Sequence, residues 1–147
     1  MVCQRRETLR FEQVRGTAYK SRLWYNGKTE FAKEQSHPET TSTTQKSIAG
    51  SLTGKWIGLK FVMYNFQKNG KTVVKLETWL DPDNDKDFVK IYERIESGGW
   101  RDDGDRCGGS SDQIITWTGP IATFRWDDAK NVDIKWLSVI EIQPPLL

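Results

Sequence analysis

The stretch KFVMYNFQKNGKTVVKLETWLD, residues Lys60 to Asp81, decides the fold. Apolar and polar residues alternate in Lys55–Phe66 and again in Thr72–Asp81, and the pair Asn69-Gly70 lies between the two segments. Alternation with a period of two is typical of a strand with one buried face, and Asn-Gly suits the two positive-φ positions of a type I′ turn. The stretch therefore predicts two antiparallel strands joined by a tight turn.

The two faces of this predicted hairpin differ in chemistry. One parity is apolar and holds Phe61, Met63, Val74, Leu76 and Leu80. The other parity carries two lysines, a glutamate and two large aromatic residues, namely Lys60, Tyr64, Lys75, Glu77 and Trp79. When one face of a sheet is buried, the opposite parity faces outward. The outward face is then either a solvated surface with cross-strand ion pairs or a surface that binds a ligand.

Similar segments recur along the chain, and windows with helical spacing are nearly absent. A second pair, Asn26-Gly27, predicts another type I′ hairpin turn, while Ser36–Thr53 and Ser97–Asp112 read as long surface loops. We therefore expect an all-β fold, a two-sheet antiparallel β-sandwich. The remaining expected strands cover Thr8–Arg15, Ala18–Tyr25, Thr29–Gln35, Phe88–Glu96, Gln113–Trp117, Ile121–Asp127 and Val132–Ile142.

Composition narrows the class of partner. The 147 residues suit a single domain over residues 1–147, which can also be a fragment of a longer protein. The 22 basic and 20 acidic residues are interleaved and give a net charge of +2, so no basic block is present that would follow a phosphate backbone. No apolar run approaches the roughly 20 residues of a membrane span, and the first residues lack the apolar core of a signal peptide. We expect neither a nucleic-acid nor a membrane partner.

The seven tryptophans favour a binding surface over a merely solvated one. Trp24 and Trp79 fall on polar parities, where uncovered indole rings without a ligand would promote aggregation. Charged groups bind sugar hydroxyls and uronate carboxylates, and aromatic rings stack on pyranose faces, so the mixture suits a polysaccharide. The expected ligand-binding residues are Lys20, Arg22, Trp24, Lys33, Lys60, Tyr64, Lys75, Glu77, Trp79 and Arg125.

Four runs of the chain carry a family resemblance: GKWIGLKFVMYN (54–65), VKLETWLDPDND (74–85), FVKIYE (88–93) and TFRWDDAKNVDIKWLSVIEI (123–142). They resemble the concanavalin A-like jelly rolls of polysaccharide lyase-like and laminarin-binding-type domains. This resemblance implies a jelly-roll sandwich with a carbohydrate groove on its concave sheet. The chain departs from the catalytic members of that superfamily, because it lacks the E-x-D-x-E strand of retaining glucanases. It also has Ile115 where the Q-I-H motif of alginate lyases has its histidine.

Two further functions stay open at this point. An eliminating polysaccharide lyase would use Tyr64 or His37 as its base and Arg125 to neutralise a uronate. His37 is the single histidine and precedes a proline, which is more typical of an exposed loop residue. The other alternative is a protein-interaction sandwich without enzymatic activity.

Metal and disulfide chemistry have little support in the sequence. The acidic runs DPDNDKD and RDDGDRC offer calcium ligands at Asp81, Asp83, Asp85, Asp102, Asp103 and Asp105. The first run lacks the glycine at position six and the glutamate at position twelve of a calcium-binding loop, so a hairpin turn is the favoured interpretation and no cofactor is expected. Cys3 and Cys107 match no metal-binding spacing, and the sequence leaves a disulfide between them open.

Overall fold

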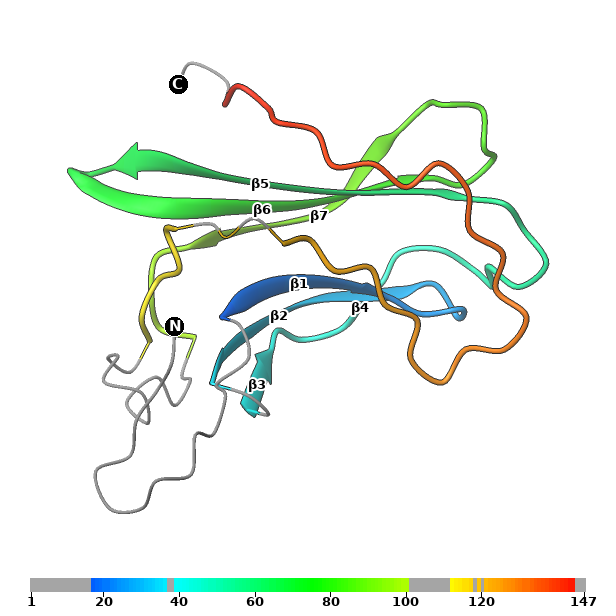
Figure 1. Ribbon diagram of the computed structural model, residues 1–147, viewed down its shortest axis with the longest axis horizontal. Coiled ribbons are helices and arrows are strands. Elements are labelled where there is room, and N and C mark those ends of the chain that lie inside the picture. Colours follow the sequence, from blue (N-terminus) through cyan, green and yellow to red (C-terminus); the bar gives the residue numbers. More distant parts are fainter. Residues whose placement is uncertain (1–16, 37–38, 101–111, 118, 120, 145–147) are drawn as a thin grey trace. The chain divides into compact units, whose positions relative to one another are not determined.

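The computed structural model describes residues 17–36, 39–100, 112–117, 119 and 121–144 (Figure 1). The described residues form strands and no helix, and therefore no helix able to cross a membrane. The strands are β1 (Ala18–Leu23), β2 (Lys28–Ser36), β3 (Glu39–Ser42), β4 (Lys46–Ser47), β5 (Gly58–Lys68), β6 (Lys71–Asp81) and β7 (Val89–Glu96).

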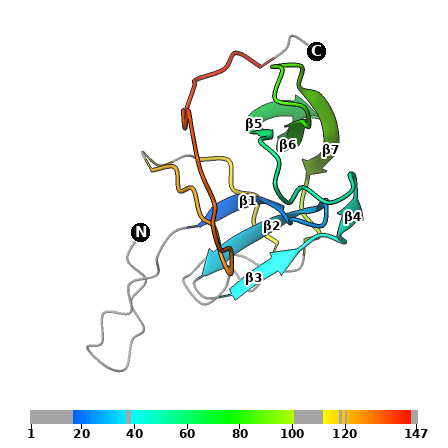
Figure 2. The ribbon, with the colours of Figure 1, turned by 90° about the vertical axis from the view of Figure 1, so that its right-hand side faces the viewer.

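The strands form two antiparallel sheets (Figure 2). In one sheet the order is β1-β2-β3, with the short β4 also paired to β2, and in the other the order is β5-β6-β7. The expectation of an all-β chain with two antiparallel sheets is confirmed. By its internal contacts the chain divides into two units, residues 1–116 and 117–147, and both sheets belong to the first unit.

The hairpin predicted over residues 60–81 is confirmed in strand, turn and register. Asn69 and Gly70 have φ values of 51° and 73°, as a type I′ turn requires. The two-residue turn places Lys60 opposite Trp79, and Tyr64 opposite Lys75. Residues directly opposite each other in a sheet share a face, so the polar parities of both strands meet on one surface.

The turn between β1 and β2 differs from the prediction. Of the pair Asn26-Gly27, only Gly27 has a positive φ, at 74°, and its N–H donates to the Trp24 carbonyl at 2.9 Å. The type I′ prediction is therefore wrong here, and the loop is a three-residue turn that ends in a left-handed glycine. The Gly27 carbonyl accepts hydrogen bonds from the Ile48 and Ala49 amides, so packing against the residues after β4 selects this turn.

The predicted strands Ala18–Tyr25, Thr29–Gln35 and Phe88–Glu96 are confirmed as β1, β2 and β7. Other predictions are wrong because a segment has a pairing partner that was not expected or lacks one that was. Residues 36–53, expected as a loop, contain β3 and β4, which both pair with β2. Conversely, none of the described residues in 113–117, 121–127 and 132–142 lies in a strand, and side chains such as Ile121 and Trp136 are 83% and 79% exposed. Alternating apolar and polar residues show that a segment is able to form a strand, but they do not show that a neighbouring strand is present to pair with it. The predicted strand Thr8–Arg15 lies outside the described residues.

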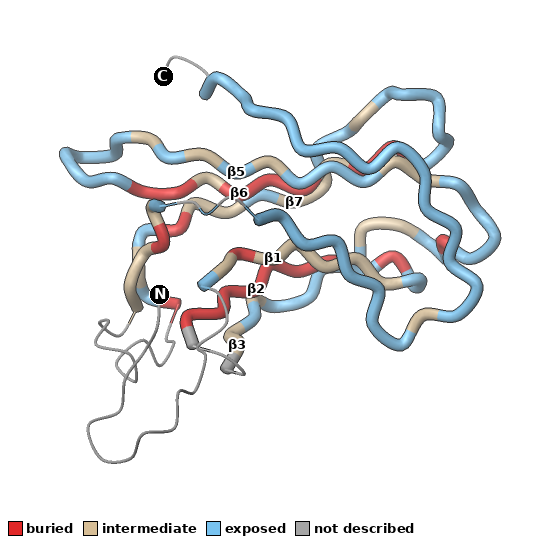
Figure 3. The backbone as a smooth tube through the Cα atoms, viewed as in Figure 1, coloured by how far each residue is buried: buried red, intermediate tan, exposed pale blue. Residues whose placement is uncertain are grey.

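The hydrophobic core lies between the inner faces of the two sheets, along β2 and β6 (Figure 3). Phe31 of β2 is fully buried and stacks on Tyr92 of β7, with ring centroids 4.6 Å apart. The hydroxyls of Ser21 and Thr78 are 2.7 Å apart across the same interior. The other face of each sheet carries most of the charged side chains described below, and three of its glutamates, Glu30, Glu34 and Glu77, are themselves buried. Phe61 and Met63, expected on the buried parity, are instead 36% and 43% exposed, because β5 is an edge strand of its sheet.

Candidate functional site

The candidate site is the outward face of the sheet β5-β6-β7, which we call the lysine–tryptophan face. Register brings its members together, because Trp79 lies opposite Lys60 on β5 and Lys90 on β7. In the same way Glu77 lies opposite Glu93, one strand away. The face consists of Lys60, Tyr64, Lys75, Glu77, Trp79, Lys90 and Glu93, of which the sequence predicted all but Lys90 and Glu93.

Trp79 is held in one orientation at the centre of this face. Its indole N–H donates a hydrogen bond to Glu77 Oε2 at 3.0 Å. The Lys60 and Lys90 ammonium nitrogens lie 4.6 and 5.7 Å from the ring centroid, within the range of cation–π attraction. The half-buried indole is therefore oriented by polar partners before any ligand arrives.

Beside Trp79 the charged side chains of β6 and β7 form a network of ion pairs. Lys90 contacts Glu93 at 2.5 Å and Glu77 at 3.4 Å, and Lys75 contacts Glu93 at 2.9 Å. The hydrogen bond to Glu93, supported by the charge of Glu77, raises the pKa of Lys90 above its ordinary value. Hydrogen bonds from Lys90 and then Lys75 lower the pKa of Glu93. Lys90 and Glu93 are therefore both charged at neutral pH.

Lys60 differs from the other lysines of the face. It forms no ion pair with any residue of the described chain, and its ammonium instead lies over two aromatic rings, those of Trp79 and, at 4.7 Å, Phe88. A cation–π contact leaves the hydrogens of an ammonium group on its solvent side available. Lys60 can therefore accept an anionic partner next to the indole ring.

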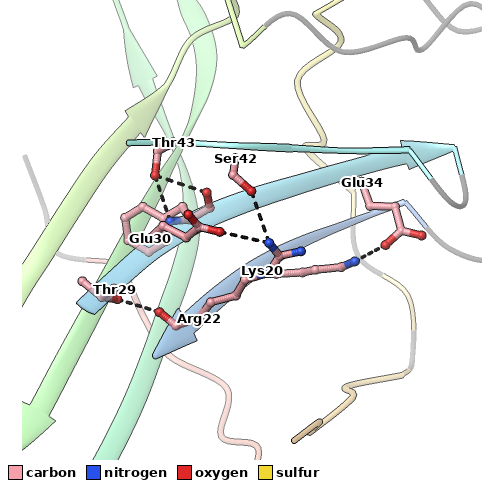
Figure 4. Close-up of polar contacts among 8 residues, drawn as sticks. Lys20, Arg22, Thr29, Glu30, Glu34, Ser42 and Thr43 are labelled. Carbon is pink, nitrogen blue, oxygen red and sulfur yellow. Dashed lines mark hydrogen bonds and ion pairs between the residues drawn. The ribbon is translucent and has the colours of Figure 1, made fainter. Parts of the chain in front are cut away.

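Lys20 and Arg22 lie elsewhere, on the outward face of the sheet β1-β2-β3 (Figure 4). Lys20 is paired with Glu34, and Arg22 donates to Glu30 at 2.9 Å and to Ser42 at 3.2 Å. The two glutamates are only 6% and 5% exposed. These two cations already have carboxylate partners, and the structure does not bring them onto the lysine–tryptophan face. Trp24 follows β1 and takes part in the turn to β2 through its backbone.

Lys33, predicted on the outward surface, is fully buried. On β2 the inward parity holds Phe31 and Lys33, so that parity is not uniformly apolar and alternation gave the wrong side for Lys33. Its ammonium nitrogen lies 3.8 Å from Glu96 Oε1 of β7, and that carboxylate is also fully buried. The placement corrects the sequence prediction. A buried ion of one sign is tolerated when a buried ion of the other sign lies close to it.

Arg125 belongs to the second unit of the chain, where it forms an exposed ion pair with Asp127 at 2.9 Å. The candidates His37, Asp102, Asp103, Asp105, Cys3 and Cys107 lie outside the described residues. Of the lyase residues named from the sequence, Tyr64 alone is therefore placed on the lysine–tryptophan face.

Asp81, the first of the calcium candidates, has a structural task. Its carboxylate oxygens accept the backbone N–H groups of Asp85 at 3.1 Å and Lys86 at 2.9 Å, which closes the turn after β6. Burial raises the pKa of Asp81, but hydrogen bonds from Lys86, Asp85 and Asn84 together lower it below its ordinary value. Across the described ranges, no three acidic, histidine or cysteine side chains gather as a metal site would require.

No family model, curated protein or solved structure matches the chain at a significant level. The function is therefore inferred from the chemistry of the face itself.

Proposed function

We propose that the lysine–tryptophan face binds an anionic polysaccharide. The observation that carries this proposal is the orientation of Trp79, whose indole N–H is fixed by Glu77 while its ring is flanked by the ammonium groups of Lys60 and Lys90. An oriented aromatic ring with charged neighbours offers a pyranose both a stacking surface and hydrogen-bonding groups.

The sign of the ligand charge follows from Lys60. Lys75 and Lys90 are each paired with glutamate on this face, whereas Lys60 lies over two aromatic rings and forms no ion pair within the described chain. A carboxylate or sulfate on a sugar stacked near Trp79 would give Lys60 the anionic partner that it lacks. Such a charge-assisted hydrogen bond is about twice as strong as a neutral one, which favours an acidic glycan over a neutral one.

We also propose that the two sheets are part of a concanavalin A-like jelly roll. Two antiparallel sheets that share a core between their inner faces support this assignment, together with the resemblance of residues 54–65, 74–85 and 88–93 to such domains. In that family of folds a sheet surface is the usual place for a sugar chain, in agreement with the site proposed here.

The proposal is tested by titrating the protein with a uronate polymer, a sulfated polysaccharide and a neutral glucan in a calorimeter. We expect the wild-type protein to bind at least one of the two anionic polymers, with an affinity that falls as salt is added. Trp79→Ala should weaken that binding about ten-fold or more, equivalent to the roughly 1.4 kcal/mol expected for a lost stacking contact. Lys60→Gln should weaken it while leaving the fold unchanged by circular dichroism.

Two variants away from this face, one in the turn between β1 and β2 and one on β2, provide matched controls. Trp24→Ala removes an indole ring and Lys28→Gln removes an exposed lysine, each without touching the lysine–tryptophan face. Both should bind like the wild-type protein. Binding of neither anionic polymer would rule out the proposed function, and equal losses in Trp79→Ala and Trp24→Ala would rule out this face as its site.

A further inference from the structure

A pocket of about 210 Å³ adjoins the lysine–tryptophan face and shares two of its residues. It is lined by Lys46, Lys90, Ile91, Tyr92 and Glu93. Lys90 and Glu93 belong to both the face and the pocket, so a ligand that follows the face reaches the pocket at β7.

An irregularity in β7 builds one wall of this pocket. Tyr92 lies opposite Thr78 and Lys90 lies opposite Trp79, which leaves Ile91 as an extra residue without a partner. Such a bulge redirects the side chains around it. The side chain of Tyr92 turns inward and stacks on Phe31, whereas Lys90 stays on the outward face, yet both line the same opening.

The opposite wall comes from the other sheet. The short strand β4 pairs with β2 and places Lys46 opposite Thr29. The Lys46 ammonium lies 4.9 Å from the centre of the Tyr92 ring, and Lys46 forms no ion pair with any residue that the structure describes. The charged groups of the pocket are therefore two ammoniums and one carboxylate, and that carboxylate already accepts from both Lys90 and Lys75.

We propose that this pocket holds an oxyanion substituent, a sulfate or a carboxylate, of the polysaccharide bound along the lysine–tryptophan face. The inference rests on the proposed function and adds to it the position of the acidic group. A pocket of about 210 Å³ has the volume of several water molecules, each about 30 Å³ in the liquid, and so suits a substituent better than a chain of sugars. Lys46 is the residue that gives the pocket its excess positive charge.

The test compares Lys46→Gln with Lys28→Gln, which removes an equal charge from an exposed position on the neighbouring strand. Affinities for the uronate polymer, the sulfated polysaccharide and the neutral glucan are measured for both variants and for the wild-type protein. Lys46→Gln should lose about ten-fold in affinity for one anionic polymer, as expected for a lost hydrogen bond to a charged group, and nothing for the neutral glucan. The polymer whose binding suffers identifies the substituent as sulfate or carboxylate.

A second variant should change the affinity for the anionic polymer in the opposite direction. Glu93→Gln removes the carboxylate from the pocket, so we expect tighter binding of the same anionic polymer. If the wild-type protein binds but Lys46→Gln behaves like Lys28→Gln, the pocket inference is wrong while the proposed function stands. If the wild-type protein binds neither anionic polymer, the proposed function fails and the pocket inference fails with it.

Discussion

At the scale of single residues, the charged side chains of this protein differ mainly in whether they already have a partner. Lys20 and Arg22 are paired with glutamates of the adjacent strand, and Lys33 is buried beside Glu96. Lys46 and Lys60 instead contact aromatic rings and no carboxylate among the described residues. An external anion can engage either of these two lysines without displacing an internal ion pair.

The pKa of Glu93 predicts how the stability of the protein depends on pH. Its pKa is lowered by hydrogen bonds from Lys90 and Lys75, so the folded state holds its proton less tightly than the unfolded state does. Its contribution to stability is therefore present above the ordinary value of 4.5 and is lost as the pH falls through the lowered pKa. The side chain is about half exposed, and solvent screening limits the contribution to at most about 1 kcal/mol.

Urea unfolding between pH 3 and 7 measures this contribution. The wild-type protein should lose more of its free energy of unfolding on acidification than Glu93→Gln does, and the two curves should converge at the acidic end. Glu141→Gln, which changes an exposed carboxylate of the second unit, should follow the wild-type curve. Parallel curves for wild type and Glu93→Gln would contradict the predicted role of the Lys75, Lys90 and Glu93 contacts.

At the scale of elements, replacing two glycines that have the same φ should have different effects on stability. Gly27 and Gly54 both have φ of 74°, a region where a side chain is strained. A Cβ atom at Gly27 would lie 2.4 Å from the Ala49 carbonyl oxygen, whereas a Cβ atom at Gly54 would meet nothing within 4 Å. The two positions therefore separate backbone strain from a steric clash.

We expect Gly54→Ala to lower the free energy of unfolding by about 1 kcal/mol, the ordinary cost of a left-handed alanine. Gly27→Ala should cost clearly more, because the added methyl group displaces the backbone that connects β4 to β5. Thermal and urea unfolding of the two variants under the same conditions provide the comparison. Equal losses would show that the segment around Ala49 moves aside without cost.

At the scale of the whole molecule, the two units differ in how their apolar residues are covered. In the first unit Phe31, Val74 and Leu76 are fully buried in the core. In the second unit the apolar residues of 132–142, among them Trp136, Val139 and Ile140, are all exposed, and none of this segment lies in a strand. Backbone amides outside regular structure exchange with solvent faster than those of a central strand.

Hydrogen exchange followed by mass spectrometry tests this difference. Peptides from β6, the central strand of its sheet, should be the most protected, and peptides covering 132–142 should exchange at nearly the rate of an unstructured chain. Strong protection across 132–142 would instead show that its alternating sequence forms a strand that pairs with a neighbour. Adding the anionic polymer during the exchange should increase protection in β6 and β7 if the proposed site is correct.

The sequence by itself determined the chemistry of one face. Asn69-Gly70 suits a two-residue turn, and such a turn fixes the register of its two strands, so the alignment of Lys60 with Trp79 and of Tyr64 with Lys75 follows from local rules. The all-β class follows in the same way from period-two alternation. Lys90 lies in a predicted strand, but its position opposite Trp79 could not be predicted. The extra residue Ile91 shifts the register of β7 against β6 by one residue.

Only the tertiary structure decided which strands share a sheet and which side of each strand faces the core. The buried position of Lys33, the separate sheet of Lys20 and Arg22, and the approach of Lys46 to Tyr92 all depend on contacts between residues distant in the sequence. The alternation of apolar and polar residues shows that a strand has two different faces. Packing between segments distant in the sequence determines which face is buried and which strands pair. For that reason one face of the candidate site was predictable, whereas the pocket beside it was not.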